Sequence, residues 1–147
     1  MRSELVKDWM TPDPVCATTH TSLPDALQMM QERRIRRLPV VDHDKLMGIV
    51  TRGDLRGAQP SEATSLSIYE VNYLLGRLTL DRIMSKNIVT VTPGTTIGDA
   101  ARLMLKHKIA GLPVVEGGRI VGILTESDVF RMVVTMWEQE DKTPATQ

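Results

Sequence analysis

The chain has 147 residues, enough for one ordinary domain or two very small ones. Its 18 basic and 18 acidic side chains cancel, so its charge gives no argument for binding nucleic acid or membranes in general. One cysteine, Cys16, excludes a disulfide framework and favours a cytoplasmic protein. Because no apolar run approaches transmembrane length, we expect neither a signal peptide nor a membrane span.

A seven-residue stretch occurs twice, at 48–54 and at 122–128, with the pattern Gly, two aliphatic residues, Thr, two variable residues, Asp. At the same offset of 74 residues, 10–55 aligns with 84–129 without a gap. Two copies are too few to stack as an array. The sequence therefore predicts a tandem duplication whose copies pair about a pseudo-twofold axis.

Each copy predicts the element order β-α-β-β-α after a short helical segment, at 5–10 and at 80–84. The first strand is expected at 15–17 and 88–91, and the two later strands at 38–41 with 46–50 and at 112–115 with 120–124. Ser22 is a plausible N-cap of the first helix, with Pro24 in its first turn. The core-facing positions of these helices repeat at i, i+3, i+4 and i+7: Leu23, Ala26, Leu27 and Met30, then Ile97, Ala100, Ala101 and Met104.

The residues between the copies predict a polar loop followed by an amphipathic helix at 67–78, which we expect to dock on the body. The last helix is expected to continue through 129–137, where Trp137 is a candidate dimer contact, before a frayed tail. The predicted fold is α/β (α+β), with two repeats packed through their sheets. Its divisions are repeat 1 at 5–57, the linker with its helix at 58–79, repeat 2 at 80–137 and the tail at 138–147.

The Thr-x-x-Asp ends of the repeated stretch have two interpretations. Thr51 with Asp54, and Thr125 with Asp128, form variant capping boxes in which both side chains satisfy free helix N–H groups. Alternatively, a strand that runs into a helix N-terminus presents N–H groups and a positive dipole end to an anion. The carboxylate is then available to accept hydrogen bonds from a ribose diol.

The two copies together resemble a pair of CBS domains, a Bateman module. Each copy carries Met followed by Thr or Ser near its start, Leu-Pro-Val-Val in the middle and the Gly-h-h-Thr-x-x-Asp end, where h is aliphatic. The resemblance covers about residues 5–137. The linker at 56–61 and its helix are also similar to small stand-alone bacterial CBS proteins of the acetoin-utilisation type.

The resemblance implies two clefts between the repeats that take adenosyl ligands: AMP, ADP or ATP first, with S-adenosylmethionine or NAD as further possibilities. Asp54 and Asp128 are then expected to bind ribose hydroxyls, and Thr51 with Thr125 to contact phosphate or ribose. Adenine is expected between the first strand and the residues before Leu-Pro-Val-Val. The positions this implies are Val15, Thr18, Val89, Thr92, Ile109, Ala110 and Gly111.

The two sites are chemically unequal. Copy one has Arg36 and Arg37 directly before Leu-Pro-Val-Val, and copy two has Ala110 and Gly111. The resemblance implies that basic residues at these positions often reach a phosphate, frequently that of the nucleotide in the neighbouring cleft. Arg binds phosphate bidentately and keeps its charge. We expect Arg33 and Arg34, by contrast, to complement the end of the preceding helix and face water.

Four functions compete. The first is a regulatory module that senses an adenine nucleotide and signals to an unknown partner protein, and the alternative is a ligand-free interaction or dimerisation module. The resemblance also implies a homodimer. We predict no enzyme, because no catalytic motif is present, and no metal site, because the three histidines show no ligand spacing. A nucleic-acid binder that uses residues 33–37 is disfavoured by the zero net charge.

Overall fold

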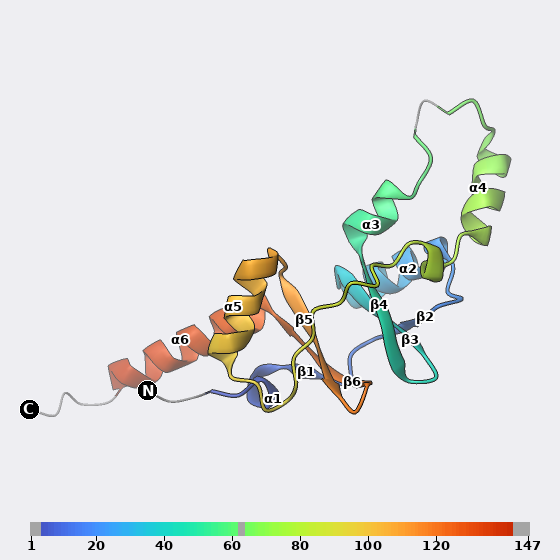
Figure 1. Cartoon of the computed structure of the whole chain (residues 1–147). Helices are drawn as coiled ribbons and strands as arrows, with labels where there is room; N and C mark the ends of the chain where they lie inside the picture. Colours follow the sequence, from blue (N-terminus) through green and yellow to red (C-terminus); the bar gives the residue numbers. More distant parts are fainter. Residues whose placement is uncertain (1–3, 62–63, 143–147) are drawn as a thin grey trace, which may run out of the picture. The chain divides into compact units, whose positions relative to one another are not determined.

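The computed structural model describes residues 4–61 and 64–142, and these residues form two compact units (Figure 1). One unit comprises Val15–Ile88 and is called here the first-repeat unit. The other joins Met1–Pro14 to Val89–Gln147 and is called the second-repeat unit. Each unit therefore contains the body of one repeat together with the segment that leads into the other repeat.

In the first-repeat unit, the short strand β2 runs parallel to β3, and β3 is antiparallel to β4. The segment before the second repeat also pairs with this sheet, because Ser85 forms an isolated antiparallel bridge with Ile49 of β4. The elements are β2 (Ala17–Thr18), α2 (Leu23–Arg33), β3 (Arg37–Asp42), β4 (Lys45–Thr51), α3 (Arg52–Gly57), α4 (Ile68–Arg77) and η1 (Leu80–Arg82).

The second-repeat unit has the corresponding arrangement. Strand β1 is antiparallel to β6, with Thr11 opposite Ile123, and β6 is antiparallel to β5. Figure 1 shows α1 and β1, from the blue end of the colour scale, beside the orange β6, as these pairings require. The elements are α1 (Val6–Trp9), β1 (Thr11–Pro12), α5 (Ile97–His107), β5 (Gly111–Glu116), β6 (Arg119–Thr125) and α6 (Glu126–Lys142).

Local signals in the sequence account for the helix starts and hairpin turns. The Ser22 side chain accepts a hydrogen bond from the amide of Asp25, so Ser22 is the N-cap of α2 as predicted. The β3–β4 turn places His43 and Asp44 at φ 49° and 67°, a left-handed conformation that Asp tolerates. Gly117 and Gly118 occupy the equivalent turn at φ 60° and 80°.

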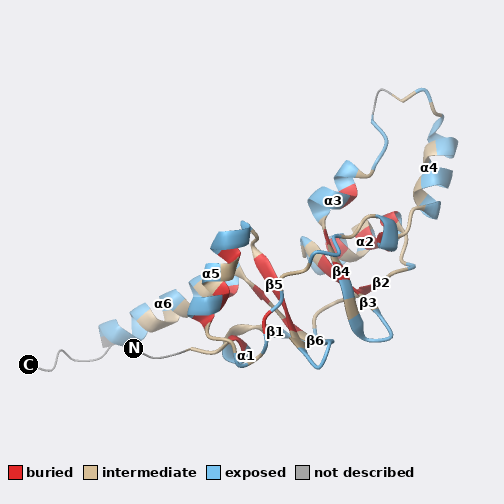
Figure 2. Ribbon diagram, in the orientation of Figure 1, coloured by how far each residue is buried: buried red, intermediate tan, exposed pale blue. Residues whose placement is uncertain are grey.

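Each unit has its own aliphatic core, seen as the red segments of Figure 2. Six of the eight core positions predicted from helical spacing are buried: Leu23, Ala26 and Met30 in α2, and Ile97, Ala100 and Met104 in α5. Leu27 and Ala101 are half-buried. The larger fully buried side chains come from strands and helices alike: Leu38, Leu112 and Leu124 in the strands, and Val6, Leu23, Leu55 and Leu80 in the helical segments.

The first strand of each repeat is shorter than predicted. Pairing in the first repeat is confined to Ala17–Thr18, and in the second to an isolated bridge between Val91 and Val114. The chain turns directly afterwards, because the amide of Thr18 donates to the hydroxyl of Thr21, and Thr92 does the same to Thr95. These turns end the first strand of each repeat and lead into α2 and α5.

Two predictions about helices need correction. The linker helix exists as α4, but it contains no buried residue, and Ile68 and Leu74 on its expected docking side are 66% and 49% exposed. Only its C-terminal end packs on the core, through Leu75 and Leu78. Helix α6 continues to Lys142, beyond the predicted end at Trp137, because its polar residues are compatible with a solvent-exposed helix. Residues 143–147 of the expected tail lie outside the described residues.

None of the helices within residues 4–61 and 64–142 has the length and apolar character that a membrane crossing requires.

Candidate functional site

The Thr51–Asp54 motif lies where β4 ends and α3 begins. The amide of Thr51 donates to Oδ2 of Asp54 at 2.9 Å, and the amide of Asp54 donates to the Thr51 hydroxyl at 3.1 Å. The capping box predicted from the sequence is therefore formed in the first repeat. This capping box uses only Oδ2 of the Asp54 carboxylate. Asp54 is exposed, and no described residue donates a hydrogen bond to its Oδ1.

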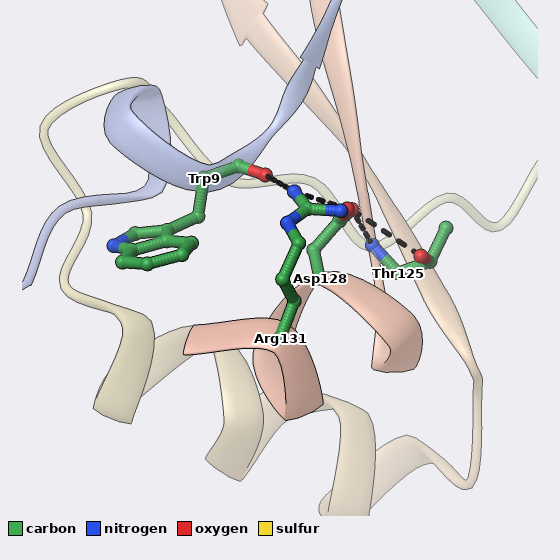
Figure 3. A network of polar contacts seen from close by, with 4 residues as sticks. All are labelled: Trp9, Thr125, Asp128 and Arg131. Carbon is green, nitrogen blue, oxygen red and sulfur yellow. Dashed lines mark hydrogen bonds and ion pairs between the residues drawn. The ribbon is translucent and has the colours of Figure 1, made fainter. Parts of the chain in front are cut away.

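The corresponding motif in the second repeat is more heavily engaged (Figure 3). Oδ2 of Asp128 accepts from the amide of Thr125 at 2.8 Å and from its hydroxyl at 3.2 Å. Oδ1 of Asp128 forms an ion pair with Arg131 at 3.0 Å. Asp128 is 4% exposed, so this carboxylate is buried and both of its oxygens have partners.

The residues before Leu-Pro-Val-Val lie next to these motifs. The carbonyl of Arg36 accepts from the amide of Arg52 at 2.8 Å, and Arg37 stands opposite Thr51 in the β3–β4 ladder. In the second repeat the carbonyl of Ala110 accepts from the amide of Glu126 at 3.0 Å, and Gly111 stands opposite Thr125. The backbone thus brings together these two groups of predicted site residues within each unit.

The first-strand residues are only partly brought to the same place. Since Ala17 pairs with Val40, the half-buried Val15 lies beside the beginning of β3. Thr18 pairs with Val41, four residues along β3 from Arg37, or roughly 13 Å at 3.3 Å per residue. Its hydroxyl lies 3.2 Å from that of Thr21, which gives Thr18 a structural role in the turn.

The second repeat follows the same geometry. Val91, the counterpart of Ala17, bridges Val114, so Val89 lies toward the beginning of β5 and Thr92 toward its end. The Thr92 hydroxyl lies 3.1 Å from that of Thr95. Thr18 and Thr92 are therefore far along the strand from the Thr-x-x-Asp motifs that we expect to hold the ribose.

The two sites also differ in charge at a position that the sequence motifs did not single out. The first helical residue after the motif threonine is Arg52 in one repeat and Glu126 in the other, and both are exposed. With Arg36 and Arg37, Arg52 gives the first repeat three basic residues next to the Thr51–Asp54 motif along the backbone. The difference is visible in the aligned sequences, at the first variable residue of each Thr-x-x-Asp motif. Arg33 and Arg34, by contrast, are exposed at the end of α2, as predicted.

A pocket of about 520 Å³ in the second-repeat unit lies between α5 and the start of α6. Its size falls in the ordinary range for small-molecule sites. It contains Ile109 and Ala110 from the predicted site, and its charged lining residues are Lys108 and Glu126. The rest of the lining is apolar: Ala101, Met104, Leu105, Val129 and Phe130.

Cys16 lies between Val15 and Ala17 and is half-buried. Burial raises the pKa of its thiol, and the nearby carboxylate of Asp44 raises it further. The thiol is accordingly protonated at neutral pH, which disfavours a nucleophilic role.

Comparison with known proteins agrees with the fold. The chain superimposes with a TM-score of 0.80 on a protein described as an acetoin utilization protein (AcuB) from Vibrio cholerae, at 34% identity over 97% of this chain and 100% of that one. It matches CBSX2, solved in complex with AMP, with a TM-score of 0.76 at 30% identity over 91% and 98% of the two chains. The CBS domain pair of MJ0100, solved with 5′-methylthioadenosine and S-adenosyl-L-methionine, gives 0.76 at 30% identity over 92% and 99%.

Curated relatives include much longer proteins. The chain spans 22% to 47% of the length of the first ones it matches, such as 23% of the L-aspartate semialdehyde sulfurtransferase of Methanocaldococcus jannaschii, at 32% identity over 130 residues. It also covers 94% of a CBS domain-containing protein from Dictyostelium discoideum, at 34% identity over 136 residues. The sequence model of the CBS domain matches residues 6–61 and 80–135. The chain therefore belongs to the CBS domain family, as a tandem pair.

Proposed function

We propose that this CBS pair is a regulatory module that binds an adenosyl ligand, with AMP, ADP or ATP as the expected class, through the Asp54 site. The observation that carries the proposal is the state of the Asp54 carboxylate. It is exposed at the N-terminus of α3 and retains an oxygen that no described residue uses. A carboxylate in this state accepts two hydroxyl groups of a ribose without breaking its capping bond.

The charges around Asp54 favour a ligand that also carries phosphate. Arg36 and Arg52 are exposed and joined through the 2.8 Å backbone hydrogen bond, and Arg37 is the next residue along β3. A guanidinium group donates two parallel hydrogen bonds to a phosphate and stays charged at all physiological pH values. The AMP in CBSX2 and the adenosyl ligands in the MJ0100 pair support the same chemical class.

Regulation follows from differential binding. A nucleotide that favours one conformation of the pair shifts the population toward it, and a partner protein that recognises that conformation responds. The partner is an unknown regulated protein.

Isothermal titration calorimetry tests the proposal, with AMP, ADP, ATP, NAD and S-adenosylmethionine as titrants. We expect saturable binding of at least one of them by the wild type, and a loss of roughly tenfold or more in affinity in Asp54→Ala. Asp25→Ala is the matched control, because Asp25 occupies the same third position of α2 without belonging to the site. Absence of binding by all five ligands to the folded wild type would reject the proposal.

A second function, homodimerisation or docking of a partner, is favoured by the surface of α6. This helix exposes large apolar side chains in its middle: Phe130 (64%), Val133 (51%), Val134 (55%) and Trp137 (68%). Contiguous apolar surface of this kind is typical of an interaction site. Light scattering on wild type and Trp137→Ser tests a homodimer, which should dissociate in the variant, and a monomeric wild type at high concentration would exclude it.

A further inference from the structure

The second repeat carries an arginine that the first repeat lacks. Arg131 lies three residues, or one turn, after Asp128 on α6. The residue at the corresponding position of the first repeat, three residues after Asp54, is Gly57. Its Nη2 atom contacts Oδ1 of Asp128 at 3.0 Å and donates to the carbonyl of Trp9 at 3.0 Å (Figure 3). Trp9 is the last residue of α1, so the guanidinium is held between a buried carboxylate and the C-terminal end of a helix.

A count of acceptor positions shows the consequence. A carboxylate offers about four lone-pair sites. In Asp128, Thr125 uses two through its amide and hydroxyl, and Arg131 uses a third, so about one remains. In Asp54, the amide of Thr51 uses one, so about three remain. A ribose diol needs two acceptor positions, and only Asp54 offers them without rearrangement.

We propose that Arg131 is a specificity-determining residue that closes the Asp128 carboxylate to ribose hydroxyls, so that the chain binds a ribose-containing ligand at Asp54 and not at Asp128. This inference rests on the proposed function. Arg131 is held in place by two acceptors, and its side chain remains 57% exposed. A ligand therefore competes with the ion pair between Arg131 and Asp128.

Asp128 keeps a structural use, because it fixes Thr125 at the start of α6 and fixes Arg131 against Trp9. In the second repeat the Asp128 carboxylate thus caps the backbone amide of Thr125, and the first repeat has the reciprocal capping box with spare acceptor capacity on Asp54.

Calorimetry with AMP on a set of variants tests the inference. Wild type should bind one AMP per chain, and Asp54→Ala should bind none in the same concentration range. Arg131→Met, which keeps the aliphatic stem and removes the charge, should open the second site. The double variant Asp54→Ala/Arg131→Met should therefore regain binding by roughly tenfold or more over Asp54→Ala. Adding Asp128→Ala should remove that binding again.

Two further variants separate the charge from a structural effect. Arg131→Lys keeps a cation near Asp128 and should leave the site closed. Arg102→Met is the matched control, because Arg102 also pairs with an aspartate three residues away, Asp99 on α5, but both side chains are exposed. It should leave the stoichiometry at one. A general loss of packing lowers affinity, whereas the inference requires a gain.

The reciprocal change tests the inference in the first repeat even if Arg131→Met fails to fold. A β-carbon on Gly57 meets no atom within 4 Å, so Gly57→Arg is accommodated and places an arginine three residues after Asp54. We expect AMP affinity to fall roughly tenfold relative to Gly57→Gln, which adds bulk without charge.

The outcomes distinguish the inference from the function on which it rests. No AMP binding by the wild type defeats the proposed function. Binding that depends on Asp54, together with no gain in the double variant or no loss in Gly57→Arg, overturns the inference alone. Two equivalent AMP molecules per wild-type chain also overturn it.

Discussion

Ser85 exchanges two backbone hydrogen bonds with Ile49: the amide of Ile49 donates to the carbonyl of Ser85 at 3.0 Å, and the amide of Ser85 returns a bond at 2.9 Å. This pair holds the segment that leads into the second repeat against β4. The same Ser85 carbonyl would lie 2.9 Å from a β-carbon on Gly48, and the side chain of Met84 fills the adjacent space. The glycine that opens the repeated motif is therefore required by packing, whatever the ligand.

Gly48→Ala should destabilise the protein by about 1–3 kcal/mol, because the added methyl group collides with backbone as well as with a side chain. For a chain of this size the melting temperature should fall by roughly 2–4 °C per kcal/mol. Thermal unfolding followed by circular dichroism measures the change. Gly57→Ala is the control, since its β-carbon meets no atom within 4 Å, and it should leave the melting temperature almost unchanged. Equal effects of the two substitutions would contradict the packing argument.

The repeat and its periodicity predicted the main elements of the fold. Strands β3 to β6, helices α2 and α5, and the starts of α3 and α6 follow directly from Leu-Pro-Val-Val, from the i, i+3, i+4 spacing and from the Thr-x-x-Asp motif. The sequence could not predict that the segments around Met10 and Met84 pack with the other repeat's body. That exchange depends on contacts between residues far apart in the chain, such as those of Ser85 with Ile49 and Thr11 with Ile123.

The residues of the candidate site were predictable from the sequence, but their burial and their hydrogen-bond partners were not. The sequence identified Asp54 and Asp128 as equivalent, and only the structure shows that one is exposed and the other buried beneath Arg131. The difference involves residues outside the motif. The guanidinium of Arg131 donates to the carbonyl of Trp9, a residue 122 positions earlier in the sequence. Register also shows that Thr18 lies away from Arg37, which a linear pattern does not reveal.

Asp128→Ala should destabilise the protein more than Asp54→Ala does. Removal of the buried Asp128 leaves the amide of Thr125 without its acceptor and Arg131 without its ion-pair partner, at a cost of roughly 2–3 kcal/mol. Removal of the exposed Asp54 costs about 1 kcal/mol, the ordinary value of a helix cap. Urea unfolding of both variants measures the difference. A larger loss in Asp54→Ala would contradict the structural role that we assign to Asp128.

Arg37→Ala should weaken the binding of AMP and ATP more than that of adenosine. The substitution removes the phosphate contact that we expect of Arg37, and the adenosine part of the ligand keeps its interactions. We expect a loss of roughly tenfold for AMP, the value of a charge-assisted hydrogen bond, measured by calorimetry. Arg33→Ala serves as the control, because Arg33 is exposed at the end of α2 and should affect none of the three ligands. An equal loss for AMP, ATP and adenosine in Arg37→Ala would remove the phosphate role.

Alkylation of Cys16 by iodoacetamide should be slow at neutral pH and rise at a higher pH than for the unfolded chain. The reason is that burial, and then the charge of Asp44, raise the pKa of the thiol in the folded protein. The folded state favours the protonated thiol, so this contribution is fully present below the unfolded-state pKa and is lost as the pH rises through the folded-state pKa.

Asp44→Asn separates the two causes of this shift. Asn tolerates the left-handed conformation of Asp44, φ 67°, so the turn is kept while the charge is removed. The pH midpoint of alkylation should move down toward that of the unfolded chain and stop short of it, because burial, the larger cause, remains. A midpoint that does not move would exclude Asp44 as a cause, and one that reaches the unfolded value would exclude burial.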